Sequence, residues 1–199
     1  MRRWQWTILA MTCAMLSGCA SDLMTQVPEE TQVTEQTSVI TFWRNNAFGA
    51  AIQAPVAEGK ENEGIDPVGI VSHGYKVRYV VEPGDHYFVV GGESSSLLKA
   101  TVQANKHYYV QVMPVMGIWK ARFALMPLNQ KHLADPKVRE RIAQTRSMRL
   151  NEAGQAWYVQ HEGDMIKKLK NAQIRHEKAE RKKGPLLQLM PEDGIDEAL

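Results

Sequence analysis

Residues 75–90 read YKVRYVVEPGDHYFVV, a run in which apolar and polar side chains alternate on both sides of a proline-glycine turn. A period of two residues is typical of a β-strand with one buried and one exposed face. The same alternation continues, with turn residues between its runs, as far as Met126. We therefore predict that the stretch from Tyr75 to Met126 forms the centre of a β-sheet.

The residues before this stretch extend the β pattern. Ser38 to Arg44 (SVITFWR) is apolar on both faces, which fits a strand buried in the middle of a sandwich. Weaker patterns at 51–57 and 65–71 bring the total to about seven or eight short strands, and this spacing favours a small antiparallel β-sandwich. We predict a mainly β fold, with the sandwich over residues 39–130 and a C-terminal α-helical extension.

Residues 1–18 have the composition of a signal peptide. A basic start precedes an apolar run of about ten residues, which is too short to cross a bilayer. The run ends in Leu16-Ser17-Gly18-Cys19, which resembles the lipobox of bacterial lipoproteins. The resemblance implies cleavage before Cys19 and acylation of this residue with chains such as palmitate, and several chains together give a stable anchor. The other interpretation is a chance cysteine in an ordinary secreted protein.

The lipobox resemblance also implies a location. No aspartate follows Cys19 directly, and lipoproteins retained at the inner membrane typically carry one there, so we expect a lipid anchor in the outer membrane, facing the periplasm. Residues 19–38 are rich in Thr, Gln and Glu without a sustained apolar period. Such a segment predicts a flexible tether, which would hold the folded domain on the order of 25 Å from the membrane.

A second resemblance lies within the sandwich. Val81-Glu82-Pro83-Gly84-Asp85-His86, followed by a turn and the pair Tyr108-Tyr109, resembles a bacterial lipoprotein family of unknown function related to PEGA modules. Asn105 stands where that family usually has a glycine, and asparagine is the residue next best able to adopt positive φ. The resemblance spans residues 38–128 and implies a small β-sandwich without known catalytic residues, hence a binding or structural role.

Residues 131–183 carry fourteen Lys or Arg against seven Asp or Glu, and we interpret them as a basic helical arm. Asp135-Pro136 predicts a helix start, because aspartate caps helices and proline suits the first helical position. We expect a helix from Lys137 to about Asn151, a break at Gly154, and a second helix from about Gln155 to Lys182. Residues 184–199 contain four acidic and no basic side chains, and we expect a disordered tail.

The arm has two interpretations. It is either a solvated helix packed on the sandwich through its few apolar residues, or a basic surface that binds anionic headgroups, peptidoglycan or an acidic envelope protein. Nucleic acid is excluded as a partner because the lipobox places the chain outside the cytoplasm.

Motifs for catalysis are absent from the sequence. It contains no Gly-x-Ser-x-Gly elbow and no phosphate-binding glycine loop, and both cysteines precede residue 20, so no disulfide joins strands of the body. Asp85, His86 and His107 fall at strand ends that share one end of the sandwich if the hairpins alternate. We predict a non-catalytic, membrane-anchored lipoprotein that binds an envelope component, without metal or cofactor. The alternative is a periplasm-facing metal-binding or hydrolytic domain that uses these three residues.

Overall fold

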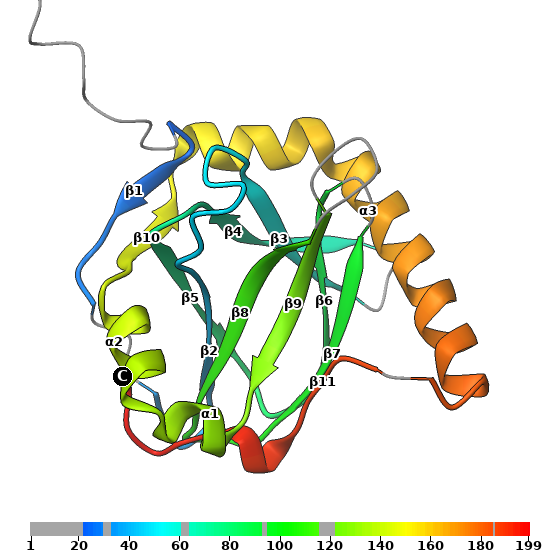
Figure 1. Ribbon diagram of the computed structural model, residues 1–199. Helices are drawn as coiled ribbons and strands as arrows, with labels where there is room; N and C mark the ends of the chain where they lie inside the picture. Colours follow the sequence, from blue (N-terminus) through cyan, green and yellow to red (C-terminus); the bar gives the residue numbers. More distant parts are fainter. Residues whose placement is uncertain (1–21, 30–32, 61–63, 93–94, 116–121, 185) are drawn as a thin grey trace, which may run out of the picture.

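The structure is a computed structural model that describes residues 22–29, 33–60, 64–92, 95–115, 122–184 and 186–199. Within these ranges the chain is mainly β, with eleven strands in two facing sheets and a long C-terminal helix (Figure 1). This confirms the predicted mainly β fold with a helical extension. Both sheets are mixed, however, because three of the strand pairs are parallel.

The order of strands in the six-stranded sheet is β1 (Met24–Gln26), β10 (Arg146–Leu150), β5 (Tyr75–Val81), β2 (Ser38–Arg44), β8 (His107–Val115) and β9 (Arg122–Leu128). The order in the five-stranded sheet is β11 (Gln188–Leu189), β7 (Ser96–Val102), β6 (Gly84–Val90), β3 (Ala54–Gly59) and β4 (Ile65–Val71).

β2 lies in the middle of its sheet, between β5 and β8, and all seven of its residues are buried. Ile40 and Phe42 point between the two sheets, into the main core, whereas Trp43 points outward into a smaller core. The short helices α1 (Gln130–Ala134) and α2 (Pro136–Ala143) cover that smaller core. The prediction of a strand with two buried faces is therefore confirmed.

The expectation of a flexible tether over residues 19–38 is wrong for its described part. β1 pairs antiparallel with β10, from Met24 opposite Leu150 to Gln26 opposite Met148. Met24 is only 5% exposed and belongs to the main core. The sequence does not reveal this strand, because its neighbouring residues are polar. The strand forms because it pairs with an edge that is more than a hundred residues away along the chain.

The first part of the predicted arm is only partly helical. Asp135 caps α2 as predicted, since its side chain accepts a hydrogen bond from the backbone N–H of Lys137 at 2.9 Å. The helix ends at Ala143, and β10 occupies the residues that we expected to continue it. Met148 and Leu150 on β10 are buried in the main core. An available edge of β5 and this burial outweigh the weak local preference for a helix.

α3 (Glu152–Arg181) is one continuous helix, so the predicted break at Gly154 is wrong. Gly154 lies in the first turn, where its N–H donates to the side chain of the N-cap residue Asn151 at 2.9 Å. A Cβ atom at this position would collide with the backbone oxygen of Leu23. The glycine therefore lets the N-terminal segment pass close to the helix start.

α3 packs on the outer face of the five-stranded sheet through one buried stripe. Leu169 occupies the space that a side chain at Gly59 would need, and Met165 lies against Gly91. The helix is thus part of the main core, and this core extends beyond residues 39–130. The buried side chains of the stripe are Tyr158, Met165, Leu169 and Ala172.

The expectation of a disordered tail over residues 184–199 is also wrong for the described residues. β11 adds to β7 as a parallel strand, and Leu189 is fully buried. Further along, Ile195 exchanges two backbone hydrogen bonds with His107, at 2.8 and 3.0 Å. The tail therefore extends the five-stranded sheet beside β7 and pairs with the start of β8 in the other sheet. It finds backbone partners and an apolar slot that its acidic composition does not reveal.

Candidate functional site

The three residues of the predicted alternative site lie at one end of the sandwich but do not converge. Asp85 and His86 are neighbours on β6 and so point to opposite faces of the sheet. His107 belongs to the other sheet, where it alternates with the inward-facing Tyr108 and so points outward. Within the described residues, no group of three His, Cys, Asp or Glu side chains is placed to hold a metal ion.

Asp85 and His107 each have local partners. The Asp85 carboxylate accepts a hydrogen bond from the Thr101 hydroxyl at 2.5 Å and lies 3.3 Å from the ammonium group of Lys99. The hydrogen bond from Thr101 lowers the pKa of Asp85. Burial, and then the positive charge of Arg78, lower the pKa of His107, so this imidazole is neutral at pH 7. Asp85 and His107 therefore do not point into a common site.

His86 instead joins a cluster between the sheets, centred on Glu58. The Tyr79 hydroxyl donates to Oε2 of Glu58 at 2.7 Å, and Nδ1 of His86 contacts Oε1 of the same carboxylate. Nε2 of His86 lies 2.8 Å from the backbone oxygen of Glu82. Since both ring nitrogens face acceptors, both carry a hydrogen and the imidazole is positively charged. The cluster is therefore a His86–Glu58 ion pair extended by a hydroxyl group.

The cluster shifts the pKa values of its three members. The hydrogen bond to Glu58 raises the pKa of His86, against the opposite effect of burial. Burial by itself raises the pKa of Glu58, but hydrogen bonds from His86 and Tyr79 outweigh it and the net change is a lower pKa. Burial, followed by the hydrogen bond to Glu58, raises the pKa of Tyr79. At neutral pH the carboxylate is thus ionised and the phenol keeps its proton.

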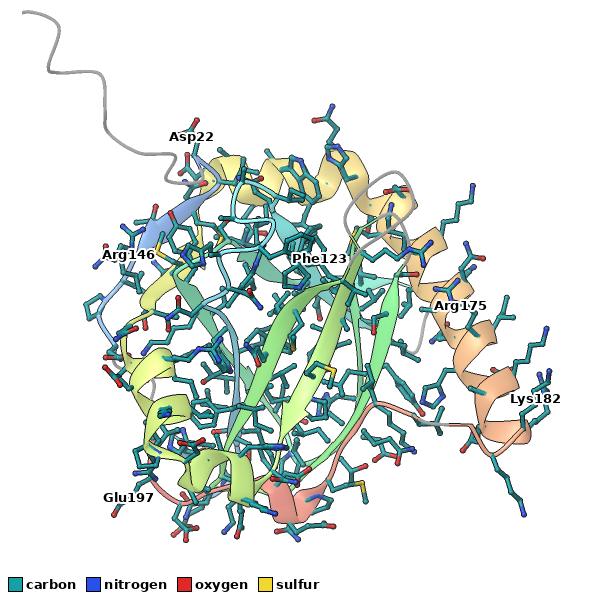
Figure 2. All side chains as sticks on the ribbon, viewed as in Figure 1. Asp22, Phe123, Arg146, Arg175, Lys182 and Glu197 are labelled. Atoms are coloured by element: carbon teal, nitrogen blue, oxygen red, sulfur yellow. The ribbon has the colours of Figure 1, made fainter. Side chains whose placement is uncertain are left out.

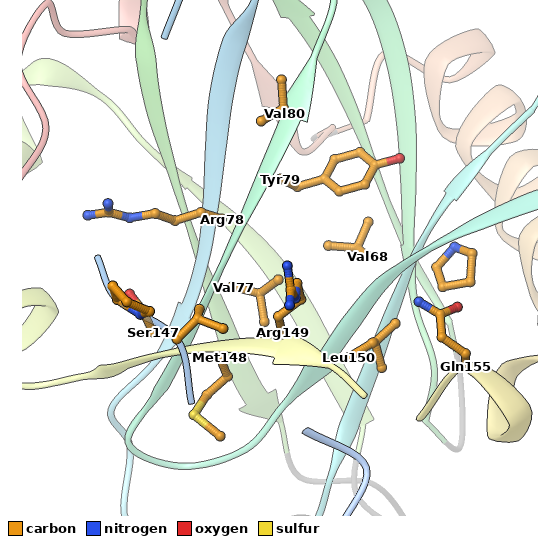
Figure 3. Close-up of a pocket in the computed structure, with 13 residues that line it drawn as sticks. Val68, Val77, Arg78, Tyr79, Val80, Ser147, Met148, Arg149, Leu150 and Gln155 are labelled. Carbon is orange, nitrogen blue, oxygen red and sulfur yellow. The ribbon is translucent and has the colours of Figure 1, made fainter. Parts of the chain in front are cut away.

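A cavity of about 590 Å³ opens beside Tyr79, at the edge of the sandwich where β4, β5 and β10 diverge (Figure 3). This volume lies within the range of about 300–1,000 Å³ that is usual for ligand pockets. Val68, Val77 and Leu150 line it with apolar side chains, and Arg78 and Arg149 add two positive charges. The cavity therefore combines apolar walls with cationic groups.

The N-terminal segment closes one side of this cavity, where Val27 and Pro28 form part of its lining. The next residue, Glu29, pairs with Lys76 and lies 3.5 Å from the guanidinium group of Arg78. The chain's own carboxylate thus already engages the outer side of β5. Arg149, by contrast, is exposed and takes part in none of the ion pairs found in the described part of the chain.

The basic side chains of α3 are spread along an exposed face. Some have partners: Arg175 donates to the backbone oxygen of Ser95 at 2.7 Å, and Arg181 lies 4.0 Å from Glu177. Lys182, the C-cap residue, projects away from the sheets at the far end of the helix (Figure 2). The predicted basic face is therefore present in the described part of the chain. Arg175 on this face also lines a smaller cavity of about 300 Å³, beside Leu97 and His176.

Sequence reasoning missed Glu58 and the cavity. Glu58 lies just beyond the weak strand pattern at 51–57, whereas β3 continues to Gly59. The inward-facing position of Tyr79 was a usable signal, because a buried hydroxyl usually needs a partner. Cys19 and the lipobox lie outside the described residues, and in the described ranges no helix is both long and apolar enough to cross a membrane.

Comparisons with protein-family models, with curated proteins and with solved structures found no match to this chain.

Proposed function

We propose that this chain is a non-catalytic, lipid-anchored binding protein of the bacterial cell envelope, held at the periplasmic face of the outer membrane through Cys19. The observation that carries the proposal is the position of the lipobox-like stretch relative to the fold. Met24, the first residue of β1, follows Cys19 by five residues, and five residues span at most about 18 Å. Acylation of Cys19 would therefore hold β1 and the adjacent cavity close to the membrane surface.

The assignment to binding rather than catalysis rests on the chemistry of the cavity. Its polar contributors are two arginines, Ser147, Gln155 and a tyrosine whose hydroxyl is already bonded to Glu58. Such a set can orient a ligand, but it offers neither an activated nucleophile nor a general base aimed into the space. We therefore propose recognition of an envelope protein or cell-wall component, without a cofactor.

The basic end of α3 is a second proposed contact with the envelope. Arg175, Lys178, Arg181, Lys182 and Lys183 place five positive charges on the last turns of the helix and just after it. Anionic lipids and peptidoglycan carboxylates are suitable partners for such a surface. Glutamine at Lys178, Lys182 and Lys183 should weaken sedimentation with anionic vesicles or purified peptidoglycan, and more strongly at low salt.

Labelling with a fatty acid in cells tests the anchor. The unchanged protein should incorporate the label and sediment with outer membranes. Cys19→Ala should abolish both properties, whereas the matched variant Cys13→Ala should keep them, because position 13 lies inside the segment that is removed. Full labelling of Cys19→Ala would overturn the anchor assignment.

Crosslinking in intact cells tests the binding role. A photoreactive residue at Val80, which is 48% exposed and lines the cavity, should give a discrete adduct. The same residue at Val159, which is 77% exposed on α3, serves as the control. Equal crosslinking from both positions, or none from Val80, would contradict binding at the cavity.

A further inference from the structure

Among the described strands, none lies beside the free edge of β5 over most of its length. β10 pairs with β5 only at Tyr75 and Lys76 and then turns away. Beyond Lys76, β5 is paired on its other side with β2, and its residues 77–80 line the cavity. In the described chain no strand covers this part of the edge. An edge of this kind presents backbone N–H and C=O groups that can pair with another strand.

β4 forms the opposite wall of the cavity, and its edge is less suited to pairing with another strand. β4 is the last strand of the five-stranded sheet, and it also borders the cavity. Pro67 lies within it, and proline removes a donor and so protects an edge from pairing. β5 has no such residue. Of the two edges at the cavity, β5 is therefore the one suited to accept a strand.

The side chains around the opening of the cavity alternate between apolar ones that face the core and basic ones that face outward. On β5, Val77 faces the main core and Arg78 faces outward; on β10, Leu150 faces the core and Arg149 is exposed. A strand placed beside β5 would therefore meet apolar walls on its inner face. On its outer face it would meet Arg149 together with Arg78, which Glu29 already contacts. In Figure 3, Arg149 projects from β10 toward the opening between β5 and β4.

The Ser147 hydroxyl is a buried polar group at the cavity that lacks a partner among the described residues. Ser147 is 8% exposed and lines the cavity, and its hydroxyl group makes no hydrogen bond within the described structure. A buried hydroxyl without a partner is unusual in a folded protein. Its position at the point where β10 leaves β5 makes it a hydrogen-bonding group available to a ligand that enters there.

From these observations we infer that the cavity binds an extended peptide segment of a partner protein, added as a strand beside Val77–Val81. Its apolar side chains would face Val68, Val77 and Leu150, and its acidic side chains would face Arg78 and Arg149. The inference rests on the proposed binding function and narrows it to one class of ligand. An acyl chain is a less suitable ligand, because it would leave the β5 edge, the Ser147 hydroxyl and Arg149 without hydrogen-bond partners.

A synthetic peptide tests this mode of recognition. The probe is a fluorescent Val-Glu-Val-Glu-Val-Glu-Val peptide with blocked ends, titrated into the chain of residues 20–199, which keeps every described residue. Binding should slow amide hydrogen exchange at Val77–Val81. Two further peptides carry N-methyl groups on the valine amides or on the glutamate amides. In an extended peptide the valine amides point to one edge and the glutamate amides to the other, so only one set can pair with β5. At least one methylated peptide should therefore bind about tenfold more weakly or worse.

Charge reversal tests the outer face. Arg149→Glu should weaken binding of the glutamate peptide by about tenfold or more, and should improve binding of the same peptide with lysine in place of glutamate. Lys131→Glu on α1 makes an equal charge change at an exposed position away from the cavity and should leave both affinities unchanged. Equal melting temperatures of the two variants show that the fold is retained.

Several outcomes would overturn the inference. These are equal binding of both methylated peptides and the parent, no binding of the parent peptide, or tight binding of palmitate at the cavity without binding of the peptide. The assay uses a chain without lipid, so its failure leaves the Cys19 anchor untouched. Conversely, loss of the anchor assignment would not alter the peptide result.

Discussion

The hydroxyl group of Tyr158 on α3 donates a hydrogen bond to the backbone oxygen of Val56 on β3 at 2.7 Å. The same hydroxyl lies 3.0 Å from the backbone oxygen of Gly69 on β4. Burial raises the pKa of Tyr158, so the phenol stays protonated and remains a donor. One side chain of the helical arm thus joins two strands of the five-stranded sheet.

Tyr158→Phe should destabilise the protein by about 1–3 kcal/mol, because two buried carbonyl groups lose this donor while the ring is kept. Denaturant unfolding measures the change. Tyr87→Phe is a matched control, since the half-buried Tyr87 hydroxyl makes no hydrogen bond in the described structure. Equal stability of both variants would show that the arm does not depend on this contact.

Two glycines of α3 should respond to alanine in opposite directions. Gly163 has no atom within 4 Å of a built Cβ, so Gly163→Ala should stabilise the helix by about 0.5–1 kcal/mol. At Gly154 the added Cβ meets the backbone oxygen of Leu23, and Gly154→Ala should cost about 1–3 kcal/mol. Hydrogen exchange at residues 24–26 should accelerate only in the second variant. A gain in stability at both sites would contradict the docking of β1.

The C-terminal segment should contribute to stability through Leu189. Leu189→Ala removes a fully buried side chain and should cost about 2–5 kcal/mol. Met190→Ala changes the next residue, which is 40% exposed, and should stay within about 0.5 kcal/mol of the parent. Thermal unfolding distinguishes them. Unchanged melting temperatures of both variants would contradict this contribution and would support a disordered tail over residues 184–199.

The His86–Glu58 pair should make stability depend on pH. The folded pKa of His86 is raised above 6.5, so its contribution is complete below that pH and is lost as the pH rises through the folded value. The folded pKa of Glu58 is lowered below 4.5, so its contribution is complete above that pH and is lost as the pH falls through the folded value. The pair therefore stabilises most between these two limits.

His86→Gln should accordingly reduce the free energy of unfolding more at about pH 5.5 than at about pH 9. Above pH 6.5, the loss of unfolding free energy caused by Glu58→Gln should likewise become smaller as the pH rises, because the imidazole loses the carboxylate that raises its pKa. Denaturant unfolding at both pH values gives the comparison. A loss of stability that does not vary with pH would mean that His86 is neutral in the fold.

The sequence alone was sufficient to predict the central strands. Ser38–Arg44 is apolar on both faces and Tyr75–Val81 alternates, so each stretch indicates its buried faces in consecutive residues, without knowledge of the partner strands. The cap at Asp135 is equally local, because its acceptor and the donor on Lys137 are two residues apart. Features whose physical cause lies within a few residues were therefore predictable.

Only the tertiary structure decided the remaining strands and the candidate site. β1, β10 and β11 are short and partly polar, and their order comes from edges supplied by residues distant in the chain. In the same way, Glu58 meets Tyr79 and His86 across 21 and 28 positions of sequence. Backbone edges and buried ion pairs form between segments brought together by folding, and no local period records them.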